Sequence, residues 1–182
     1  MLKVELKNSF FKAIKKKETK NKPPPPFTTS SLQQEASNKS GTSPKMCMSI
    51  AQKLYERGLI TYMRTDSVEL SKEALEMLSK HIIEKYGEEY YCKRLYKAKT
   101  KSTQEAHEAI RPVKISTVNI EGTSREKRLY KLIHDRTVAC QMASSKKDVF
   151  TLTIHMSNRS DKIESKIEVL TFLGYLKVYN MK

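Results

Sequence analysis

The chain has 182 residues, of which 30% are charged and 38% hydrophobic, and its formal net charge is +15. This basic balance favours a polyanionic partner, either nucleic acid or an acidic membrane surface. The sequence contains no apolar run long enough to span a bilayer and no signal-peptide pattern, so we expect no membrane insertion. Three widely spaced cysteines form no CxxC pair, which argues against a disulfide framework or a zinc site and favours reduced thiols inside a cell.

The N-terminal segment predicts a short strand and then a linker. Residues 2–6 alternate apolar and charged side chains, which is typical of a half-buried strand. A lysine-rich run at residues 15–22 leads into four prolines at residues 23–26. Because like charges repel and prolines cannot continue a strand or a helix, we interpret this stretch as an extended linker. A loop that tracks phosphates is the alternative for the lysine run.

Two helices are predicted next. Residues 27–41 fit a helix with a capping box from Ser31 and Gln34, and Gly41 can close its C-terminus. Three hydroxyl residues crowd its start, where free N–H groups attract phosphate; plain capping is the alternative for each of them. Ser43 and a proline begin a second helix that Gly58 ends, and its expected buried stripe comprises Met46, Ile50 and Leu54. Gln52 lies off this stripe and could reach a base or a sugar.

Residues 59–67 carry the most distinctive chemistry in the chain. Their first half is apolar and β-branched, as in a short buried strand, and their second half combines a cation, an anion and two hydroxyls. Side chains two apart on a strand share a face, so Tyr62 and Arg64 would point the same way. A phenol oxygen can attack phosphorus while a guanidinium holds the non-bridging oxygens. The alternative is ordinary packing of Tyr62 beside a surface ion pair between Arg64 and Asp66.

Two more helices and a histidine–arginine pair follow. Ser71 caps a helix that runs to Gly87, and Thr123 with Glu126 forms a capping box for the next. Between these helices, residues 88–102 read as irregular. His107 and Arg111 are four residues apart and would share one helical face with room for a phosphate, although Pro112 disfavours helix at Arg111.

The C-terminal segment returns to a β pattern. Residues 144–147 read as a turn, residues 149–156 alternate cleanly, and residues 158–161 turn the chain again. Ile163, Ile167 and Val169 alternate in the next strand, and residues 172–179 can form a further strand around Gly174. We therefore expect an α+β, mostly α fold. A β arch formed by residues 1–26 and 144–182 would carry a helical lobe at residues 27–143.

Three ordered motifs give the chain a family resemblance. Residues 51–67 resemble the active-site segment of type IA DNA topoisomerases, in the bacterial topoisomerase I branch. Residues 26–34 precede this segment and residues 104–112 follow it at family-like spacing, whereas the match in the tail is looser and centres on residues 172–178. The resemblance implies that the helical lobe is a winged-helix, catabolite-activator-like catalytic and DNA-binding domain.

The resemblance also implies a reaction. Tyr62 would attack a backbone phosphorus of single-stranded DNA and keep the 5′ phosphate, so that negative supercoils relax without ATP. Arg64 would stabilise the phenolate and the phosphorane, and His107 would position a neighbouring phosphate. These three are the expected catalytic residues. The expected DNA-binding residues are Thr28, Thr29, Ser30, Gln33, Gln52, Thr65, Asp66, Ser67 and Arg111.

The chain departs from the family pattern in its carboxylates. Type IA enzymes hold Mg²⁺ with an Asp-x-Asp motif and a glutamate in a Toprim domain, and this sequence contains no Asp-x-Asp. We therefore expect the central part of such an enzyme, with no metal ligands of its own. Its partners would be single-stranded and supercoiled DNA and a Toprim-containing remainder, and its location would be cytoplasmic, with the nucleoid. The alternative functions are a non-catalytic basic winged-helix module that binds nucleic acid, and a basic scaffold or ribosome-associated protein.

Overall fold

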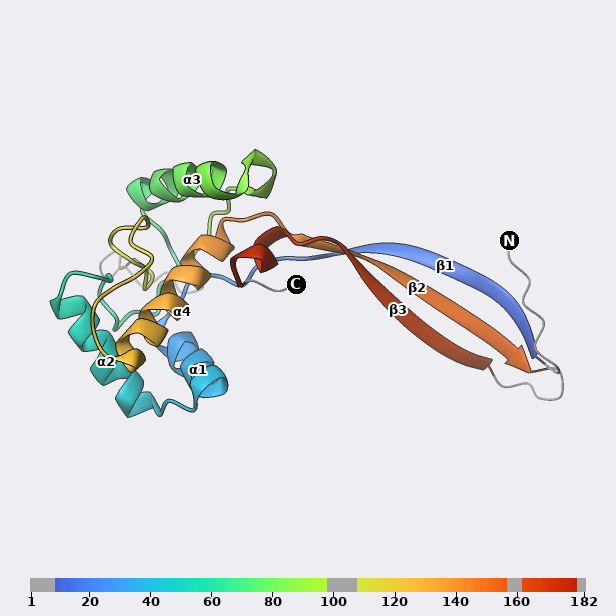
Figure 1. Cartoon of the computed structure of the whole chain (residues 1–182), viewed down its shortest axis with the longest axis horizontal. Coiled ribbons are helices and arrows are strands. Elements are labelled where there is room, and N and C mark those ends of the chain that lie inside the picture. The colour runs from blue at the N-terminus through green and yellow to red at the C-terminus, as the bar shows by residue number, and fades with distance from the viewer. Residues whose placement is uncertain (1–8, 98–107, 157–161, 180–182) are drawn as a thin grey trace. The chain divides into compact units, whose positions relative to one another are not determined.

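The computed structural model describes residues 9–97, 108–156 and 162–179. It has the predicted α+β class and divides into two compact units (Figure 1). The strand unit comprises Met1–Lys22 and Ser144–Gly174, and the helical unit comprises Pro23–Ala143 and Tyr175–Lys182. The predicted division differs from this one in its tail, because the residues from Tyr175 onward belong to the helical unit. In the described ranges, no helix combines the length and the apolar character needed to cross a membrane.

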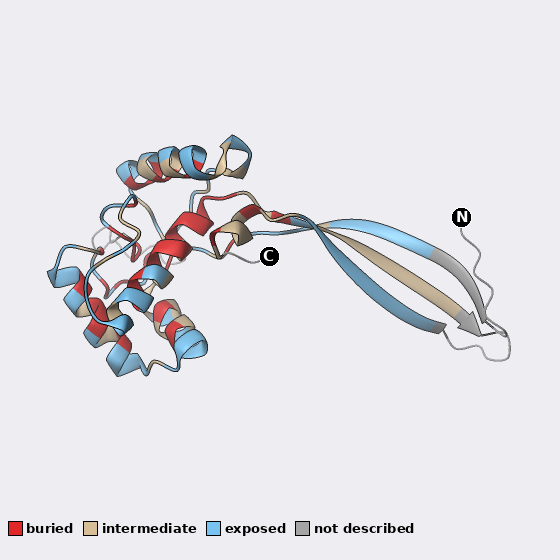
Figure 2. Ribbon diagram, in the orientation of Figure 1, coloured by how far each residue is buried: buried red, intermediate tan, exposed pale blue. Residues whose placement is uncertain are grey.

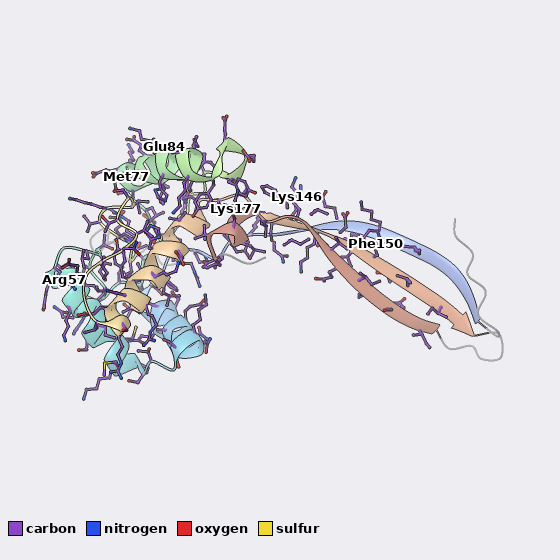
Figure 3. The ribbon with its side chains drawn as sticks, in the orientation of Figure 1. Arg57, Met77, Glu84, Lys146, Phe150 and Lys177 are labelled. Carbon is purple, nitrogen blue, oxygen red and sulfur yellow. The ribbon has the colours of Figure 1, made fainter. Side chains whose placement is uncertain are left out.

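The strand unit is an antiparallel sheet with the order β1-β2-β3. Its strands are β1 (Ser9–Asn21), β2 (Ser145–Met156) and β3 (Lys162–Phe172). β1 pairs with β2 from Ser9 opposite Met156 to Asn21 opposite Ser145, and a register shift lies between Phe11 and Ala13. Figure 3 labels Lys146 and Phe150 on β2, the central strand.

Three predictions about this unit were wrong. The lysine-rich run, predicted to be a linker, is strand as far as Asn21, because pairing with β2 satisfies its backbone and Lys16 pairs with Asp148 at 2.7 Å. The turn predicted at residues 144–147 is largely strand, since β2 begins at Ser145. The strand predicted after Phe172 is instead the 3-10 helix η2 (Gly174–Tyr179), because Gly174 takes a left-handed φ of 52°. The strand expected at residues 2–6 and the turn at 158–161 lie outside the described residues.

The described residues of the helical unit include four α-helices. These are α1 (Thr29–Ser40), α2 (Pro44–Glu56), α3 (Lys72–Tyr86) and α4 (Ser124–Cys140), with the short η1 (Glu88–Tyr90) after α3. The predicted N-caps Ser43, Ser71 and Thr123 are confirmed, and Thr123 forms its capping box with Glu126. For α1 the predicted capping box was wrong. Thr28 is the N-cap, and Ser31 is the third helical residue of that box.

Two buried clusters hold the helical unit together, and both include residues of α4 (Figure 2). The first cluster joins α1 and α2 to α4 through fully buried side chains such as Leu32, Leu54 and Ile133. The second joins α3 to α4 through Leu78, Ile82 and Val138. Met46 does not belong to either cluster and is 40% exposed, contrary to the predicted stripe, because Cys47 takes the buried position.

Short backbone contacts, not strands, join the loops of this unit. Isolated bridges pair Phe27 with Ile110, Ile60 with Pro112 and Tyr91 with Met142. Within the described residues these bridges do not extend into a strand pair that could form a wing. The winged-helix detail therefore stays a prediction.

Candidate active site

The tyrosine predicted to be catalytic lies in the loop between α2 and α3. The chain leaves α2 through its C-cap Arg57, labelled in Figure 3, and turns at Gly58, whose φ is 65°. Thr61 then donates its N–H to the carbonyl of Arg111 at 2.9 Å. The strand predicted here was wrong: only the bridge at Ile60 forms, because the loop finds a partner segment for a few residues alone.

Exposed and buried side chains nevertheless alternate along this loop. Tyr62 is 43% exposed, and Arg64 and Asp66 are also exposed. The residues between and after them, Met63, Thr65 and Ser67, are only 1%, 6% and 7% exposed. Extended backbone places alternate side chains on opposite sides, so burial of one set directs the other outward. Tyr62, Arg64 and Asp66 therefore face solvent, and this fits the prediction that Tyr62 and Arg64 point the same way, although no β ladder orders them.

Hydrogen bonds from Thr29, at the start of α1, hold the backbone of this loop. Thr29 donates its N–H to the carbonyl of Thr65 at 2.8 Å, and its hydroxyl donates to the carbonyl of Met63 at 2.8 Å. The same hydroxyl accepts the N–H of Thr65 at 2.9 Å. Thr29, predicted to contact DNA, thus uses its side chain to hold the backbone on either side of Arg64. We call this set of bonds the Thr29 clip.

An open depression of about 410 Å³ lies between α1 and this loop. All six of its lining residues were selected from the sequence: Thr29, Ser30, Gln33, Arg64, Thr65 and Asp66. Among the described residues neither Arg64 nor Asp66 has a hydrogen-bond or ion-pair partner, so the surface ion pair considered as the alternative does not form there. A guanidinium without an internal partner, beside the hydroxyls at a helix N-terminus, suits a phosphate.

The remaining predicted DNA-binding residues have other uses in the structure. Thr28 accepts the N–H of Ser31 at 3.3 Å as the cap of α1. Gln52 donates its amide to Glu56 along α2 at 2.8 Å. The Ser67 hydroxyl accepts a backbone N–H at 3.1 Å and is buried. His107 lies outside the described residues, so its predicted role stays a prediction.

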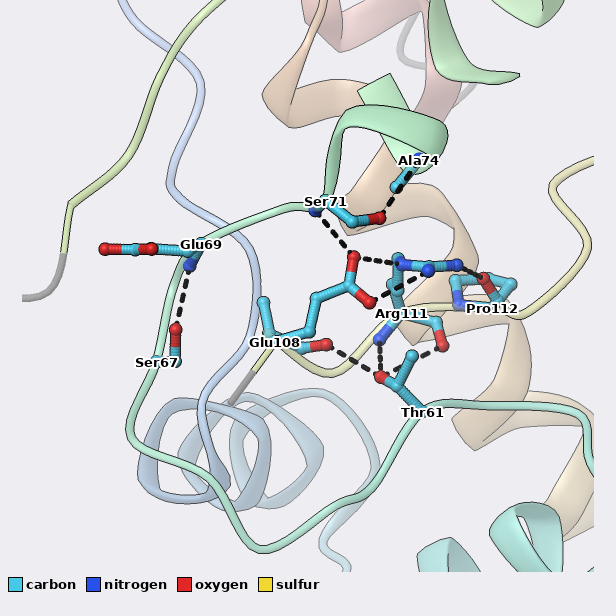
Figure 4. A network of polar contacts seen from close by, with 9 residues as sticks. Thr61, Ser67, Glu69, Ser71, Ala74, Glu108, Arg111 and Pro112 are labelled. Atoms are coloured by element: carbon cyan, nitrogen blue, oxygen red, sulfur yellow. Dashed lines mark hydrogen bonds and ion pairs between the residues drawn. The ribbon is translucent and has the colours of Figure 1, made fainter. Parts of the chain in front are cut away.

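Arg111 is buried in a polar network, which Figure 4 shows. Its Nε and Nη2 donate to the two carboxylate oxygens of Glu108 at 2.7 and 2.9 Å, and its Nη1 donates to the carbonyl of Pro112 at 2.9 Å. Glu108 also accepts the N–H of Ser71, the N-cap of α3, at 2.8 Å. Burial acts to raise the pKa of Glu108, but the hydrogen bonds from Arg111 and Ser71 outweigh it and leave that pKa below its usual value.

This network corrects the geometry expected for the third motif. Residues 108–112 are not helical, and the Arg111 guanidinium is turned toward Glu108. A partly buried, bidentate pair of this kind ties residues 108–112 to the start of α3. The contact between Arg111 and a phosphate stays a prediction, and in this structure Arg111 orders two loops.

The sequence reasoning missed one aromatic neighbour of Tyr62. Tyr55, in the last turn of α2, meets Tyr62 edge-on, with 5.4 Å between ring centroids and 69° between ring planes. Edge-to-face packing of this kind restricts the orientations of both rings. The only available signal was the position of Tyr55 inside the distinctive segment 51–67.

The described residues offer no magnesium site of their own. No group of three histidine, cysteine, aspartate or glutamate side chains converges within residues 9–97, 108–156 and 162–179. The depression lined by Arg64 has one carboxylate, Asp66, in its lining. Magnesium prefers several oxygen ligands in octahedral geometry, so this donor set does not fit the ion.

Comparisons with known proteins place this site in a family. A family model described as DNA topoisomerase matches residues 3–182. A protein of Acanthamoeba polyphaga mimivirus named DNA topoisomerase 1 type prokaryotic is 47% identical, over 96% of this chain and 22% of that protein. DNA topoisomerase 1 of Rickettsia bellii is 44% identical, over 97% of this chain and 24% of that protein.

A solved structure agrees with these relatives. Full-length topoisomerase I from Thermotoga maritima superposes with a TM-score of 0.81 at 34% identity, over 94% of this chain and 29% of that chain. The chain thus spans roughly a quarter of the length of the relatives it matches. Sequence, fold and family model agree over nearly its whole length, and the resemblance to type IA enzymes is confirmed: the chain belongs to the DNA topoisomerase family.

Proposed function

We propose that this chain is the part of a type IA topoisomerase that forms the covalent bond to single-stranded DNA. The observation that carries the proposal is the outward-facing pair of Tyr62 and Arg64 on a loop held by the Thr29 clip. Tyr62 is 43% exposed. Arg64 lines the depression and has no ion-pair partner among the described residues. A fixed cation beside a nucleophile stabilises charge that develops on phosphate oxygens.

The proposed step conserves its bonds. The Tyr62 oxygen loses its proton and forms a bond to phosphorus, while the bond from phosphorus to the 3′ oxygen breaks and that oxygen takes up a proton. The 5′ phosphate stays on Tyr62, and the reverse attack by the 3′ hydroxyl religates the strand. One phosphoester replaces another, so the cycle needs no ATP. In this scheme His107 positions a neighbouring phosphate, and a Toprim domain outside this sequence supplies Mg²⁺.

The Tyr62 assignment is tested in an enzyme reconstituted with a Toprim-containing partner. Tyr62→Phe is expected to abolish the denaturant-resistant DNA adduct, because phenylalanine keeps the ring but removes the attacking oxygen. Tyr55→Phe is the matched control and should keep the adduct, since it preserves the edge-on ring contact. Equal DNA affinity of both variants would show that folding and binding are intact. An adduct that persists in Tyr62→Phe and maps to another tyrosine would refute the proposal.

A second candidate function is a module that binds nucleic acid without catalysis. It is favoured by the net charge of +15 together with the lack of a three-ligand metal group among the described residues. We expect the isolated chain to bind single-stranded DNA and not to relax supercoiled plasmid. Binding should weaken with salt by about 0.7 in log–log slope per neutralised phosphate. Magnesium-dependent relaxation by the isolated chain would contradict this expectation.

A further inference from the structure

A second depression of the helical unit lies at the opposite end of α1 from the candidate active site. Two hollows, of about 220 and 320 Å³, share Ser40, Thr42, Arg125 and Arg128 in their linings and therefore form one groove. The end of α1, the start of α2 and the first half of α4 surround it. We call it the basic groove.

The charge of the basic groove is not internally neutralised. Four cationic side chains and one carboxylate line it. Lys39 pairs with Glu35 at 3.0 Å and Lys131 with Asp135 at 2.7 Å. In the described part of the chain, Arg125 and Arg128 make no hydrogen bond or ion pair. They are exposed and three residues apart on α4, so both guanidiniums lie on one face of that helix.

The floor of the basic groove is apolar. Ile50 and Leu129 are only 6% and 4% exposed, Leu132 is half-buried, and the ring of Tyr179 forms part of the lining. The ammonium of Lys39 lies 5.0 Å from the centre of the Tyr179 ring. The groove thus combines apolar and aromatic lining residues with two exposed arginines.

This combination fits a nucleotide of a single strand. A guanidinium binds phosphate through paired hydrogen bonds, and an unstacked base can lie on an aromatic or apolar surface. A duplex keeps its bases stacked and could offer the groove only its phosphates. An acidic peptide would match the arginines, but its carboxylates bring no planar apolar group to the floor.

We propose that the basic groove is a second contact for single-stranded DNA, separate from the contact at Tyr62. The proposal rests on the proposed function insofar as DNA is the ligand. The active-site depression takes in Thr29 and Gln33 at the start of α1, and the groove takes in Lys39 and Ser40 at its end. The 12 residues of α1 span about 18 Å at 1.5 Å per residue. At about 3.4 Å per stacked nucleotide, a strand needs about five nucleotides to cover that length.

The test compares two double variants of the whole chain. Arg125→Gln/Arg128→Gln removes the two lining cations that have no ion-pair partner among the described residues. Lys114→Gln/Lys127→Gln removes the same charge from exposed positions outside its lining, and Lys127 lies on α4 between the two arginines. Dissociation constants of a labelled 20-nucleotide strand are measured by fluorescence anisotropy across a salt series. Melting temperatures confirm that both variants fold.

The groove variant is expected to weaken binding about tenfold or more and to lower the salt slope by about 1.4, from two lost phosphate contacts. The lysine control should change affinity less than about threefold, because neither lysine lines the groove and an exposed charge without a direct phosphate contact adds only a screened attraction. Arg125→Lys/Arg128→Lys should restore part of the affinity. Strands that carry 4-thiothymidine should photo-crosslink to the groove, at Tyr179 or at residues 125–132, as well as to the Tyr62 loop.

Equal affinities of the two glutamine variants, or crosslinks confined to the Tyr62 loop, would overturn the second contact. Either result leaves the adduct test of Tyr62→Phe unaffected. Conversely, the adduct could persist in Tyr62→Phe while the groove still crosslinks to DNA. That result would refute the assignment of Tyr62 as the nucleophile and would support the groove as a DNA contact.

Discussion

The helical unit and the strand unit differ in how far their apolar side chains are buried (Figure 2). In the helical unit Ile133 is completely buried between helices, whereas in the strand unit Ile163, Ile167 and Val169 are 46%, 52% and 48% exposed. Ile133 belongs to the apolar stripe of a helix, and the three β3 residues follow the alternation of a strand. The comparison teaches that periodicity locates a helix or a strand, but does not say whether its apolar face is covered. In the strand unit, residues 163–171 of β3 are exposed and residues 149–154 of β2 are half-buried.

The largest expected effect comes from replacing one isoleucine in each unit by alanine and comparing the losses of stability. Ile133→Ala should lower the free energy of unfolding by about 3–4 kcal/mol, because it removes buried methylenes and leaves a cavity. Ile167→Ala on β3 should cost less than about 1 kcal/mol, because its side chain is half exposed already. Urea unfolding followed by circular dichroism measures the first effect. Hydrogen exchange with mass spectrometry reports on each unit separately. Equal losses for the two variants would show that β3 is covered in solution.

A smaller effect is expected from the partly buried pair of Arg111 and Glu108. Arg111→Met should cost about 2–3 kcal/mol at pH 7, because Glu108 keeps its charge but loses two hydrogen bonds. The matched control Lys39→Met breaks an exposed pair on α1 and should cost about 0.5 kcal/mol or less. Both are measured by urea unfolding.

The pair also predicts a pH dependence. The pKa of folded Glu108 lies below its ordinary value of 4.5, so its contribution is fully present above that value and is lost as pH falls through the folded pKa. The stability gap between wild type and Arg111→Met should therefore shrink as pH falls below 4.5. A gap that stays constant between pH 7 and acid would show that the lost methylene packing of Arg111, and not its charge pair, carries the effect.

Local signals predicted the helices well because their caps are local. Ser43, Ser71 and Thr123 each satisfy an N–H three residues ahead, which a short stretch of sequence encodes. The cap of α1 was misplaced by three residues because several hydroxyls compete there. The Thr29 clip, which bonds to residues 34 and 36 positions away, is a tertiary contact that no local pattern shows.

Distant partners explain the other differences. The lysines of β1 became a strand through pairing with β2, more than 100 positions later in the chain. The third motif, by its resemblance to the family, predicted that Arg111 contacts a phosphate. In the structure its guanidinium instead pairs with the carboxylate of Glu108, three residues earlier. For the candidate site, the period of two predicted that Tyr62 and Arg64 share a face, and both are exposed in the structure. The sequence did not predict the loop that holds the pair or the ring of Tyr55.

Helix α4 has a consequence for how the helical unit comes apart. Its first half supplies Leu129 and Ile133 to one buried cluster, and its second half supplies Val138 to the other. One continuous helix cannot leave one cluster while its far end stays rigidly packed in the other, because its backbone hydrogen bonds couple successive turns. The two clusters are thus expected to melt as one cooperative block. The apolar lining of the basic groove and the packing beneath the Tyr62 loop both depend on the first cluster. They would then be lost together, at the same rate, when this block unfolds.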